Sequence, residues 1–456
     1  MMLRRAHRAC RVSVVAKCRA ERARGAAGLV ARSGARPSAA LASPVLWAGG
    51  DASGERTRAL LGVALAGLSA TGLALTWRSR GLRCEVSPAG PGETDVRVVT
   101  YNLLSPPLAS PSHFPKCAPE DVDHRNRFPR IRARLEQEVA AGSVIGLQEV
   151  DLGWAGQLHT FFAERGYVAV FAQYGKTMNG YMGVMLAWPT AQFEVQDVEI
   201  SRLSDTAPKQ MWPKVQKGSS PLNTYGFLTK QGLKDVLGCW PPSDGQQEPG
   251  AFEWNTAKDR FNEAIFVRLR PRSPGVGKAF VVSTYHMPCL FGAPEKVRVV
   301  NIHAYLLMSR LRAFAADDPA ILMGDFNIKP GTSPYCLFAS GGSLDAASAA
   351  PCGCEEVAGL QARLPAGRPW PDGLASAYCR FHGKEPLFTN YAQTSGMREP
   401  FVETLDYIWY SPRDFSVVAC PGLPQRREEV AGPFPNRQEP SDHVLLGATL
   451  RLGASA

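Results

Sequence analysis

An α/β sandwich is the fold class that the amino-acid sequence predicts, and two patterns predict it. From Asp95 onward, short apolar runs bounded by turn residues alternate with longer stretches in which apolar residues recur at helical spacing. No internal repeat is visible in that alternation. Alternating strands and helices are typical of sheets whose faces are covered by helices.

The expected strands are short and mostly apolar, and turn residues bound them. They are Val96–Tyr101, Val144–Leu147, Met182–Trp188, Ala264–Leu269, Phe280–Tyr285, Ala320–Met323 and Thr404–Tyr410. Helical spacing and length predict helices over Asn126–Ala141 and Glu295–Ala316. Two Gly-, Pro- and Ser-rich stretches without steady periodicity, Ser204–Glu253 and Gly341–Lys384, are interpreted as insertions.

Basic residues are concentrated in the N-terminal part of the chain. The net charge is +10, but residues 1–80 alone carry fourteen Arg or Lys against three acids. The remaining residues are close to neutral, so the bulk charge does not indicate a nucleic-acid-binding surface. A segment rich in Arg, Ala and Ser is typical of an organelle presequence. Residues 1–58 are therefore predicted to direct the protein to the mitochondrion, with a plastid, or a disordered basic tail, as alternatives.

Residues 59–77 form an uncharged, largely apolar run of nineteen residues. That is about the length that a helix needs to cross the hydrocarbon core of a membrane. Arginines flank the run on both sides, so charge asymmetry does not orient it. We expect a single membrane anchor here, and the alternative is a further part of a cleaved presequence. Residues 78–94 are the expected linker to a main domain over residues 95–452.

The eleven cysteines are odd in number and irregularly spaced, and no CxxC occurs. A zinc site or a disulfide framework needs regular or paired spacing, so neither is expected. Free thiols in a reducing compartment fit this pattern best.

Polar side chains stand at the ends of the expected strands. They are Asn102, Glu149, His286, Asp325 with Asn327, Asp406, and Asp442 with His443. A single polar residue at a strand end usually caps the strand or starts a turn, but six such positions in one domain are hard to explain in that way. Strand ends converge at one edge of a sheet, where α/β proteins bind ligands.

The residue types at these strand ends predict a particular chemistry. Carboxylates and carboxamides without a Cys/His cluster are ligands suited to Mg²⁺ or Mn²⁺ rather than to Zn²⁺. The histidines can donate to a phosphate or move a proton near neutral pH. Together they suit attack of water on a phosphoric ester. No GxSxG motif and no phosphate loop occur, so a covalent nucleophile is not expected.

Five short motifs follow one another along the chain. They are TYNLLS at Thr100–Ser105, GLQEV at Gly146–Val150, GDFN at Gly324–Asn327, LDYIW at Leu405–Trp409 and SDH at Ser441–His443. In this order, over roughly Asp95 to Leu452, they resemble the endonuclease/exonuclease/phosphatase superfamily, also called deoxyribonuclease-I-like. That resemblance implies a four-layer α/β sandwich, in which two packed mixed β-sheets are flanked by helices.

Within the superfamily, the chain is most similar to the branch of carbon-catabolite-repression deadenylases, nocturnin, Angel proteins and 2′-phosphodiesterases. The NLLS form and the run from Ser376 to LDYIWYS carry that similarity. TYHMPC around His286 and the segment Tyr174–Val184 depart from the branch pattern, which leaves a preference for poly(A) open.

The resemblance also implies a role for each strand-end residue. Glu149 resembles the principal Mg²⁺ ligand, and Asn102 and Asp442 would help to hold the metal or its waters. Mn²⁺ is the alternative ion.

The remaining strand-end residues resemble catalytic groups. Asp325 and Asn327 would orient or deprotonate the attacking water and bind the phosphate. His443 would contact the scissile phosphate, and Asp406 would fix its tautomer through a hydrogen bond. His286 would donate to a phosphate oxygen. Asp325 and His443 jointly carry the role of general base.

Residues outside the motifs are weaker candidates for binding substrate. Asn262 precedes the His286 strand and could contact phosphate, or it could serve a turn. Asn179 and Tyr181 could line the substrate pocket, or they could shape a loop. Arg125 and Arg127 lie at the start of the expected helix Asn126–Ala141, just before and just inside it, and could also touch the substrate.

The function expected from these observations is Mg²⁺-dependent 3′-exoribonuclease activity on RNA, of the deadenylase kind. The alternative is a phosphatase or phosphodiesterase acting on a small phosphoester or lipid, such as an inositol phosphate, a nucleotide 2′-phosphate or sphingomyelin. A catalytically inactive scaffold is a third class, but every implied catalytic position is filled here.

Overall fold

The computed structural model describes residues 89–90, 92–213, 251–272 and 278–453. The chain divides into two units, Met1–Leu75 and Thr76–Ala456, and every described residue lies in the second. The predicted presequence and the predicted anchor at residues 59–77 lie outside the described residues. Among the helices that the structure describes, none has both the length and the apolar character needed to span a bilayer.

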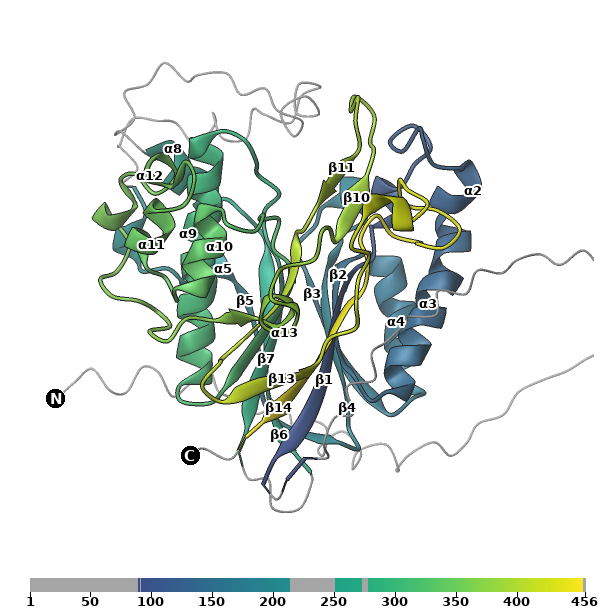
Figure 1. Cartoon of the computed structure of the whole chain (residues 1–456), viewed down its shortest axis with the longest axis horizontal. Helices are drawn as coiled ribbons and strands as arrows, with labels where there is room; N and C mark the ends of the chain where they lie inside the picture. The colour runs from purple at the N-terminus through teal and green to yellow at the C-terminus, as the bar shows by residue number, and fades with distance from the viewer. Residues whose placement is uncertain (1–88, 91, 214–250, 273–277, 454–456) are drawn as a thin grey trace, which may run out of the picture. The chain divides into compact units, whose positions relative to one another are not determined.

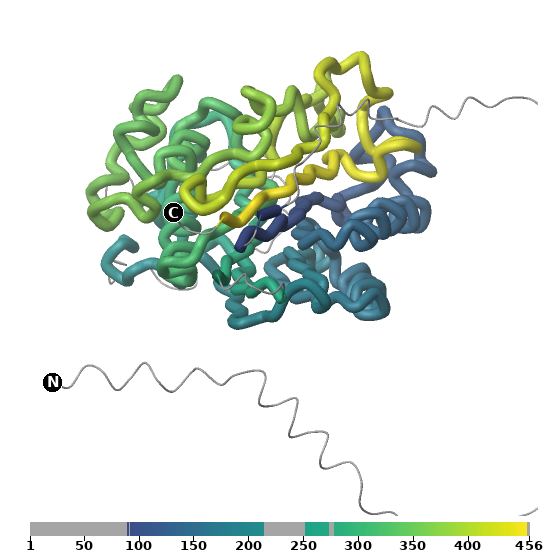
Figure 2. The backbone as a smooth tube through the Cα atoms, turned by 60° about the horizontal axis from the view of Figure 1, so that its bottom comes forward, coloured from purple at the N-terminus to yellow at the C-terminus, as the bar shows by residue number. Residues whose placement is uncertain are grey.

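The first of two six-stranded mixed sheets has the strand order β13-β14-β1-β2-β4-β3. Its strands are β1 (Thr94–Asn102), β2 (Val144–Val150), β3 (Tyr167–Gln173), β4 (Gly183–Pro189), β13 (Phe415–Ala419) and β14 (Leu446–Leu452). Only β1 and β2 run parallel, and the other neighbours are antiparallel. The first and last strands of the domain are paired, and Figure 2 shows them side by side in purple and yellow.

The second sheet has the order β5-β6-β7-β8-β12-β9. Its strands are β5 (Phe193–Arg202), β6 (Glu263–Pro271), β7 (Phe280–His286), β8 (Ala320–Asp325), β9 (Ala375–Ser376) and β12 (Asp406–Tyr410). Here β7 and β8 are the parallel pair. A separate two-stranded ribbon consists of β10 (Asn390–Ala392) and β11 (Phe401–Glu403).

Helices cover the outer face of each sheet (Figure 1). The first sheet carries α3 (His124–Ala140) and α4 (Leu152–Ala163), and the second carries α8 (Ala251–Lys258), α9 (Pro294–Ala315) and α10 (Ser333–Ala339). The predicted four-layer sandwich is therefore confirmed. The shorter helices are α2 (Pro119–Val122), α5 (Leu203–Thr206), α11 (Leu344–Ser348), α12 (Gly353–Glu356) and α13 (Ala377–His382), and the 3₁₀ turns are η2 (Pro106–Leu108), η3 (Thr177–Asn179), η4 (Lys209–Met211), η5 (Leu360–Ala362) and η6 (Arg427–Glu429).

Strand periodicity decides which side chains enter the core between the sheets. In β1, Val96 and Val98 face the other sheet, whereas Val99 and Tyr101 pack beneath α3 and α4. Successive strand side chains point to opposite faces. Asn102 keeps the phase of Val96 and Val98, so its side chain points between the sheets.

The same phase holds in the second sheet. The inward-facing residues Val282, Met323 and Ile408 of β7, β8 and β12 are apolar and fully buried. At one end of these three strands the inward positions become polar. These positions are His286, Asp325 and Asp406.

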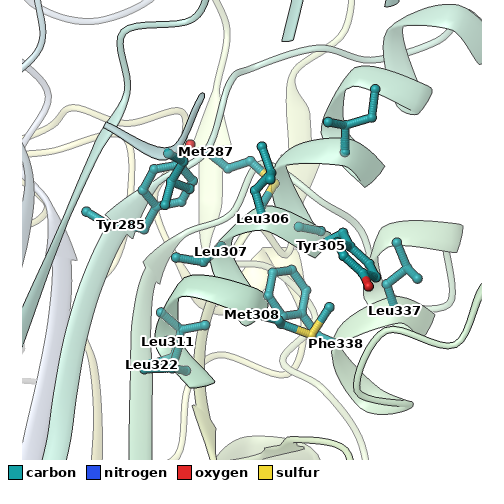
Figure 3. Close-up of a cluster of buried hydrophobic side chains, with 14 of the residues drawn as sticks. Tyr285, Met287, Tyr305, Leu306, Leu307, Met308, Leu311, Leu322, Leu337 and Phe338 are labelled. Atoms are coloured by element: carbon teal, nitrogen blue, oxygen red, sulfur yellow. The ribbon is translucent and has the colours of Figure 1, made fainter. Parts of the chain in front are cut away.

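Helix α9 forms the outer core of the second sheet. Leu307 and Leu311 of α9 are fully buried, and Figure 3 shows Leu311 beside Leu322 of β8, with Phe338 of α10 nearby. Burial of each such side chain contributes about 1.5–3 kcal/mol. This packing holds β8 in place behind the polar strand ends.

All seven expected strands and both expected helices are present, with ends shifted by a few residues. The expectation for Gly341–Lys384 needs correction, because this stretch forms α11, α12 and α13 and buries Leu360 and Trp370 in the outer core. Of the other proposed insertion, residues 214–250 lie outside the described part. All seven cysteines in the described residues are free thiols, as expected.

Candidate active site

Glu149 lies at a break in the regular pairing of the first sheet. The register between β2 and β4 shifts between Leu147 and Val150, and Glu149 has a φ of +55°. A bulge of this kind redirects a side chain, and a left-handed non-glycine residue costs about 1–3 kcal/mol. The half-buried Glu149 carboxylate accepts hydrogen bonds from Asn102 Nδ2 at 3.2 Å and from the Ser105 backbone N–H at 3.0 Å.

Asn102 links the two sheets at this end. Its Oδ1 accepts the Leu104 backbone N–H at 2.9 Å, which orients the amide so that Nδ2 is the free donor. Nδ2 then donates to Glu149 and, at 3.0 Å, to Asp325 Oδ2 of the other sheet. One buried carboxamide therefore holds two carboxylates side by side.

Asp325 stands at the end of β8, directly after Gly324. Gly324 has a φ of +152°, and a Cβ there would lie 2.0 Å from the Tyr285 carbonyl oxygen, so only glycine fits. Burial raises the pKa of the Asp325 carboxyl to about 6, against the lowering effect of His443 and His286. The Asp325 carboxylate therefore takes up a proton at a pH closer to neutral than an ordinary aspartate does.

Asn327 fixes the chain just beyond Asp325. Its backbone N–H donates to Asp325 Oδ1 at 2.9 Å, and its side-chain Nδ2 donates to the Met287 carbonyl oxygen at 3.0 Å. Asn327 also has a left-handed backbone, with a φ of +50°. It thereby ties the end of β8 to the residue that follows His286.

His443 is oriented by a buried carboxylate. Its Nδ1 donates to Asp406 Oδ2 at 2.7 Å, which is the expected hydrogen bond. Thr389 Oγ1 donates to the same oxygen at 2.6 Å and accepts the backbone N–H of Leu405 and of Asp406. Burial by itself lowers the pKa of His443, but the carboxylates of Asp406, Asp325 and Asp442 raise it well above 6.5. The opposite ring nitrogen, Nε2, lies 3.7 Å from Asp325 Oδ2.

His286 is oriented by a phenol instead. Tyr174 Oη lies 2.6 Å from His286 Nδ1, and burial raises the pKa of Tyr174 well above 10. A phenol can donate or accept, but the Asp325 carboxylate near Nε2 only accepts, so we assign the ring proton to Nε2 and the phenol as the donor to Nδ1. His286 Nε2 lies 3.5 Å from Asp325 Oδ2. Asn262 Nδ2 supports the same strand end by donating to the His286 carbonyl oxygen at 2.8 Å.

One known family matches the stretch of chain that carries all of these groups. A sequence model described as the Endonuclease/Exonuclease/phosphatase family matches residues 99–443. The chain belongs to this family. The expected class of enzyme, a phosphodiesterase or nuclease of this family, is thereby confirmed.

Curated relatives agree with the predicted branch. The CCR4-Not complex 3′-5′-exoribonuclease subunit Ccr4 of Emericella nidulans is 35% identical over 379 residues, which are 77% of this chain and 51% of the relative. Carbon catabolite repressor protein 4 homolog 4 of Arabidopsis thaliana is 34% identical over 248 residues, which are 50% of this chain and 53% of the relative. This chain thus spans about half the length of the curated relatives it matches.

A solved structure shares the fold. The crystal structure of ANGEL2, described as a 2′,3′-cyclic phosphatase, superposes with a TM-score of 0.54 at 18% sequence identity. The match covers 80% of this chain and 97% of that chain.

The donor set of the site fits a hard divalent cation. Four carboxylates lie at this end of the two sheets: those of Glu149, Asp325, Asp406 and Asp442. Burial raises the pKa of Asp442, and the charge of Glu149 adds to the effect. Within the described residues, oxygen atoms of Asp325 and Asp406 and a nitrogen of His443 lie within 4.8 Å of one another and could hold a metal ion. Asp406 Oδ2, however, already accepts hydrogen bonds from His443 and Thr389. The half-buried carboxylates of Glu149 and Asp442 are more open, and oxygen ligands favour Mg²⁺ or Mn²⁺.

The two loop residues predicted to bind substrate differ in what their side chains do. Asn179 Oδ1 accepts the Lys176 backbone N–H at 2.7 Å, so this side chain closes its own loop. Tyr181 is 40% exposed, and its hydroxyl accepts a hydrogen bond from Thr177 Oγ1 at 2.8 Å. The Tyr181 ring is therefore open to a ligand, whereas the half-buried Asn179 uses its Oδ1 within its own loop.

The interpretation of Arg127 as a substrate contact is wrong. Arg127 is fully buried, and it donates to the carbonyl oxygens of Leu103, Leu104 at 2.7 Å and Pro440 at 2.5 Å. Burial lowers its pKa to about 10. Arg127 thus ties the segment after Asn102 to the segment before His443.

Tyr174, Thr389 and Arg127 are the site residues whose roles the sequence reasoning missed. Tyr174 lies in the segment noted for departing from the branch pattern, and that departure was the only available signal.

Proposed function

We propose that this protein is a Mg²⁺-dependent 3′-exoribonuclease that cleaves the RNA backbone by attack of water. The observation that carries the proposal is the convergence of two oriented histidines on one carboxylate oxygen, at 3.5 Å and 3.7 Å. This arrangement suits a phosphodiester, whose oxygens need hydrogen-bond donors while a water molecule loses a proton. RNA as substrate is inferred from the relatives named 3′-5′-exoribonucleases.

Glu149 would be the principal ligand of the metal, with Asp442 and Asn102 holding it or its waters. The bound ion would neutralise charge on the phosphate and assist the leaving oxygen. The excess of carboxylates over cationic groups at this edge supports that assignment, because such a cluster is unfavourable without a counter-charge.

The other side chains act on water and phosphate. Asp325, aligned by the Asn102 amide and the Asn327 backbone N–H, accepts the proton of the attacking water. His443, kept charged by Asp406, donates from Nε2 to a phosphate oxygen. His286 donates from its own Nε2 on the other side of Asp325.

Tyr181 would contact a base of the substrate through its exposed ring. Asn179 and Asn262 would act on the substrate indirectly. Asn179 shapes the loop that carries Tyr181, and Asn262 holds the backbone of His286.

The test uses the purified full-length chain and two 5′-labelled RNAs, one ending in oligo(A) and one of mixed sequence. We expect a ladder of shortened products with Mg²⁺, and none with EDTA or in the Glu149→Ala variant. The rate ratio of the two RNAs measures any preference for poly(A).

Intact RNA from folded, Mg²⁺-loaded protein would overturn the proposal. Release of phosphate from inositol phosphates or a nucleotide 2′-phosphate, or of phosphocholine from sphingomyelin, would then support the small-phosphoester or lipid reading. A Glu149→Ala variant that kept the wild-type rate and fold would refute the metal assignment.

We also propose the layout of the chain before the catalytic domain, which rests on composition. Residues 1–58 would be a mitochondrial presequence, 59–77 a membrane anchor and 78–94 a linker to the catalytic domain at 95–452. A fluorescent fusion of residues 1–58 should accumulate in mitochondria, and diffuse cytosolic signal would contradict this. Import into plastids of a photosynthetic host would support the alternative. Carbonate extraction of the full chain tests the anchor.

A further inference from the structure

Two cations and an exposed aromatic ring meet beside the active site. Lys176, in the loop after β3, and Arg202, at the end of β5, both lie over the ring of Phe261, in the loop before β6. Lys176 Nζ and Arg202 Cζ are each 4.7 Å from the ring centroid. Phe261 itself is 47% exposed, which is unusual for so large an apolar side chain.

The two cations differ in their surroundings, because only Arg202 has carboxylate neighbours among the described residues. Arg202 Nε and Nη2 each donate at 2.9 Å to backbone carbonyl oxygens of Arg260 and Lys258, so the guanidinium is held in place by neutral groups. Two carboxylates lie near it in the described residues: Asp205 at 3.6 Å, with a side chain that is 70% exposed, and Glu263, which lies opposite Arg202 across β5 and β6. Lys176 forms no ion pair with any described residue. The Lys176 ammonium at the ring therefore has no described carboxylate partner, and a phosphate oxygen would supply one.

The cluster is connected to the active site on both sides through His286. Tyr174, two residues before Lys176, donates to His286 Nδ1, and Asn262, directly after Phe261, donates to the His286 carbonyl oxygen. Lys176 is thus part of the loop that carries Tyr174. Arg202 donates to the Arg260 carbonyl oxygen in the loop that carries Asn262. Lys176 and Phe261 thus lie within two residues of the side chains that contact His286.

We propose that Lys176 and Arg202, arranged by the Phe261 ring, bind the phosphate of a nucleotide that flanks the scissile bond. This inference rests on the proposed function, because it requires a polynucleotide substrate. Contacts to backbone phosphates carry no base information, so the site lengthens the footprint on RNA without selecting sequence.

The test compares the full-length wild type with Lys176→Gln on two RNAs, at a series of salt concentrations. One RNA is the dinucleotide ApA, whose single phosphate is the scissile one, and the other is a hexamer of adenylate. The matched control is Arg413→Gln, which removes one charge from an exposed residue in the turn after β12, at the far end of that strand from Asp406.

For the hexamer, we expect Lys176→Gln to raise KM about fivefold with kcat unchanged, and to reduce the slope of log(kcat/KM) against log[salt] by about 0.7. On ApA the variant should match the wild type. Arg413→Gln should match the wild type on both RNAs. Phe261→Leu should repeat the Lys176→Gln pattern, because both cations lose the ring that gathers them.

An unchanged KM and salt slope on the hexamer would overturn the proposal. So would an equal loss on ApA, since Lys176 would then act on the scissile phosphate or on His286. If the wild type cleaves neither RNA, the proposed function fails by itself. In that case, fluorescence anisotropy measures binding of the labelled hexamer to the wild type and to Lys176→Gln without metal. A smaller salt slope for the variant would support the phosphate site, and equal slopes would overturn it.

Discussion

His443 and His286 approach the same Asp325 oxygen from two regions of the molecule, but different partners hold their Nδ1 atoms. In the region of β12 and the segment before β14, the partner is the Asp406 carboxylate. In the region of β7 and the loop after β3, it is the Tyr174 phenol. The carboxylate fixes the ring and also raises the pKa of His443, whereas the phenol fixes the ring without adding charge. Two similar side chains can thereby take different catalytic duties at one site.

The largest expected effect comes from removing the charge of the His443 partner. Asp406→Asn keeps the shape but no longer stabilises the imidazolium, so we expect kcat on RNA to fall by about 10³-fold. Single-turnover cleavage measures the loss, and the thermal midpoint shows whether the fold is intact. A loss below tenfold with an intact fold would mean that the Asp406 charge is not needed.

A smaller loss is expected on the other side of the comparison. Tyr174→Phe removes a neutral hydrogen bond and leaves His286 Nδ1 without its donor, so we expect kcat to fall about tenfold. The matched control is Tyr167→Phe, whose hydroxyl donates to the Val139 carbonyl oxygen at 3.2 Å, outside the site. If Tyr174→Phe lowered kcat as much as Asp406→Asn, the proposed difference between the two histidines would be wrong.

A third buried histidine, remote from catalysis, gives the smallest effect on rate. His303 in α9 contacts Tyr285 Oη at 3.0 Å and the Ala257 carbonyl oxygen at 3.1 Å, and burial lowers its pKa to about 4. The unfolded chain, with a histidine pKa of about 6.5, binds a proton in this range that the folded chain does not. The stability that His303 contributes is therefore complete above pH 6.5 and is lost as pH falls toward 4.

At pH 5 this linkage should cost about 2 kcal/mol of unfolding free energy relative to pH 7.5. Urea unfolding of the wild type and of His303→Gln at the two pH values measures it. The variant should show a pH dependence smaller by that amount, with kcat at pH 7.5 unchanged. Parallel pH dependences of the two proteins would show that His303 is not responsible.

Much of the site could be predicted from the sequence because strand periodicity continues to the last residue of each strand. Asn102, His286 and Asp325 each end the inward-facing series of a strand, whereas Asp406 begins one, and they meet because these strand ends meet. Glu149 breaks that rule. A regular continuation of β2 would turn its side chain to the outer face, and only the bulge opposite β4 brings it to Asn102.

The partners of the histidines show where local pattern stops being informative. Asp406 was predicted as the partner of His443 because both lie in recognised motifs. Tyr174 and His286 are 112 residues apart, and their hydrogen bond depends on how the loop after β3 lies against β7. Arg127 was likewise predicted to touch the substrate, yet the fold places it beneath two loops, where it donates to backbone carbonyl oxygens.

By itself the sequence determined the alternation of strands and helices, the polar strand ends and, through its motifs, the family. Periodicity and local chemistry depend on residues that are close together in the chain, so they can be recognised without a structure. Only the tertiary structure decided which carboxylates share one amide, which group orients His286, and that Lys176 and Arg202 meet at Phe261. These contacts join residues far apart in the chain, and the packing of the two sheets and their loops sets the distances.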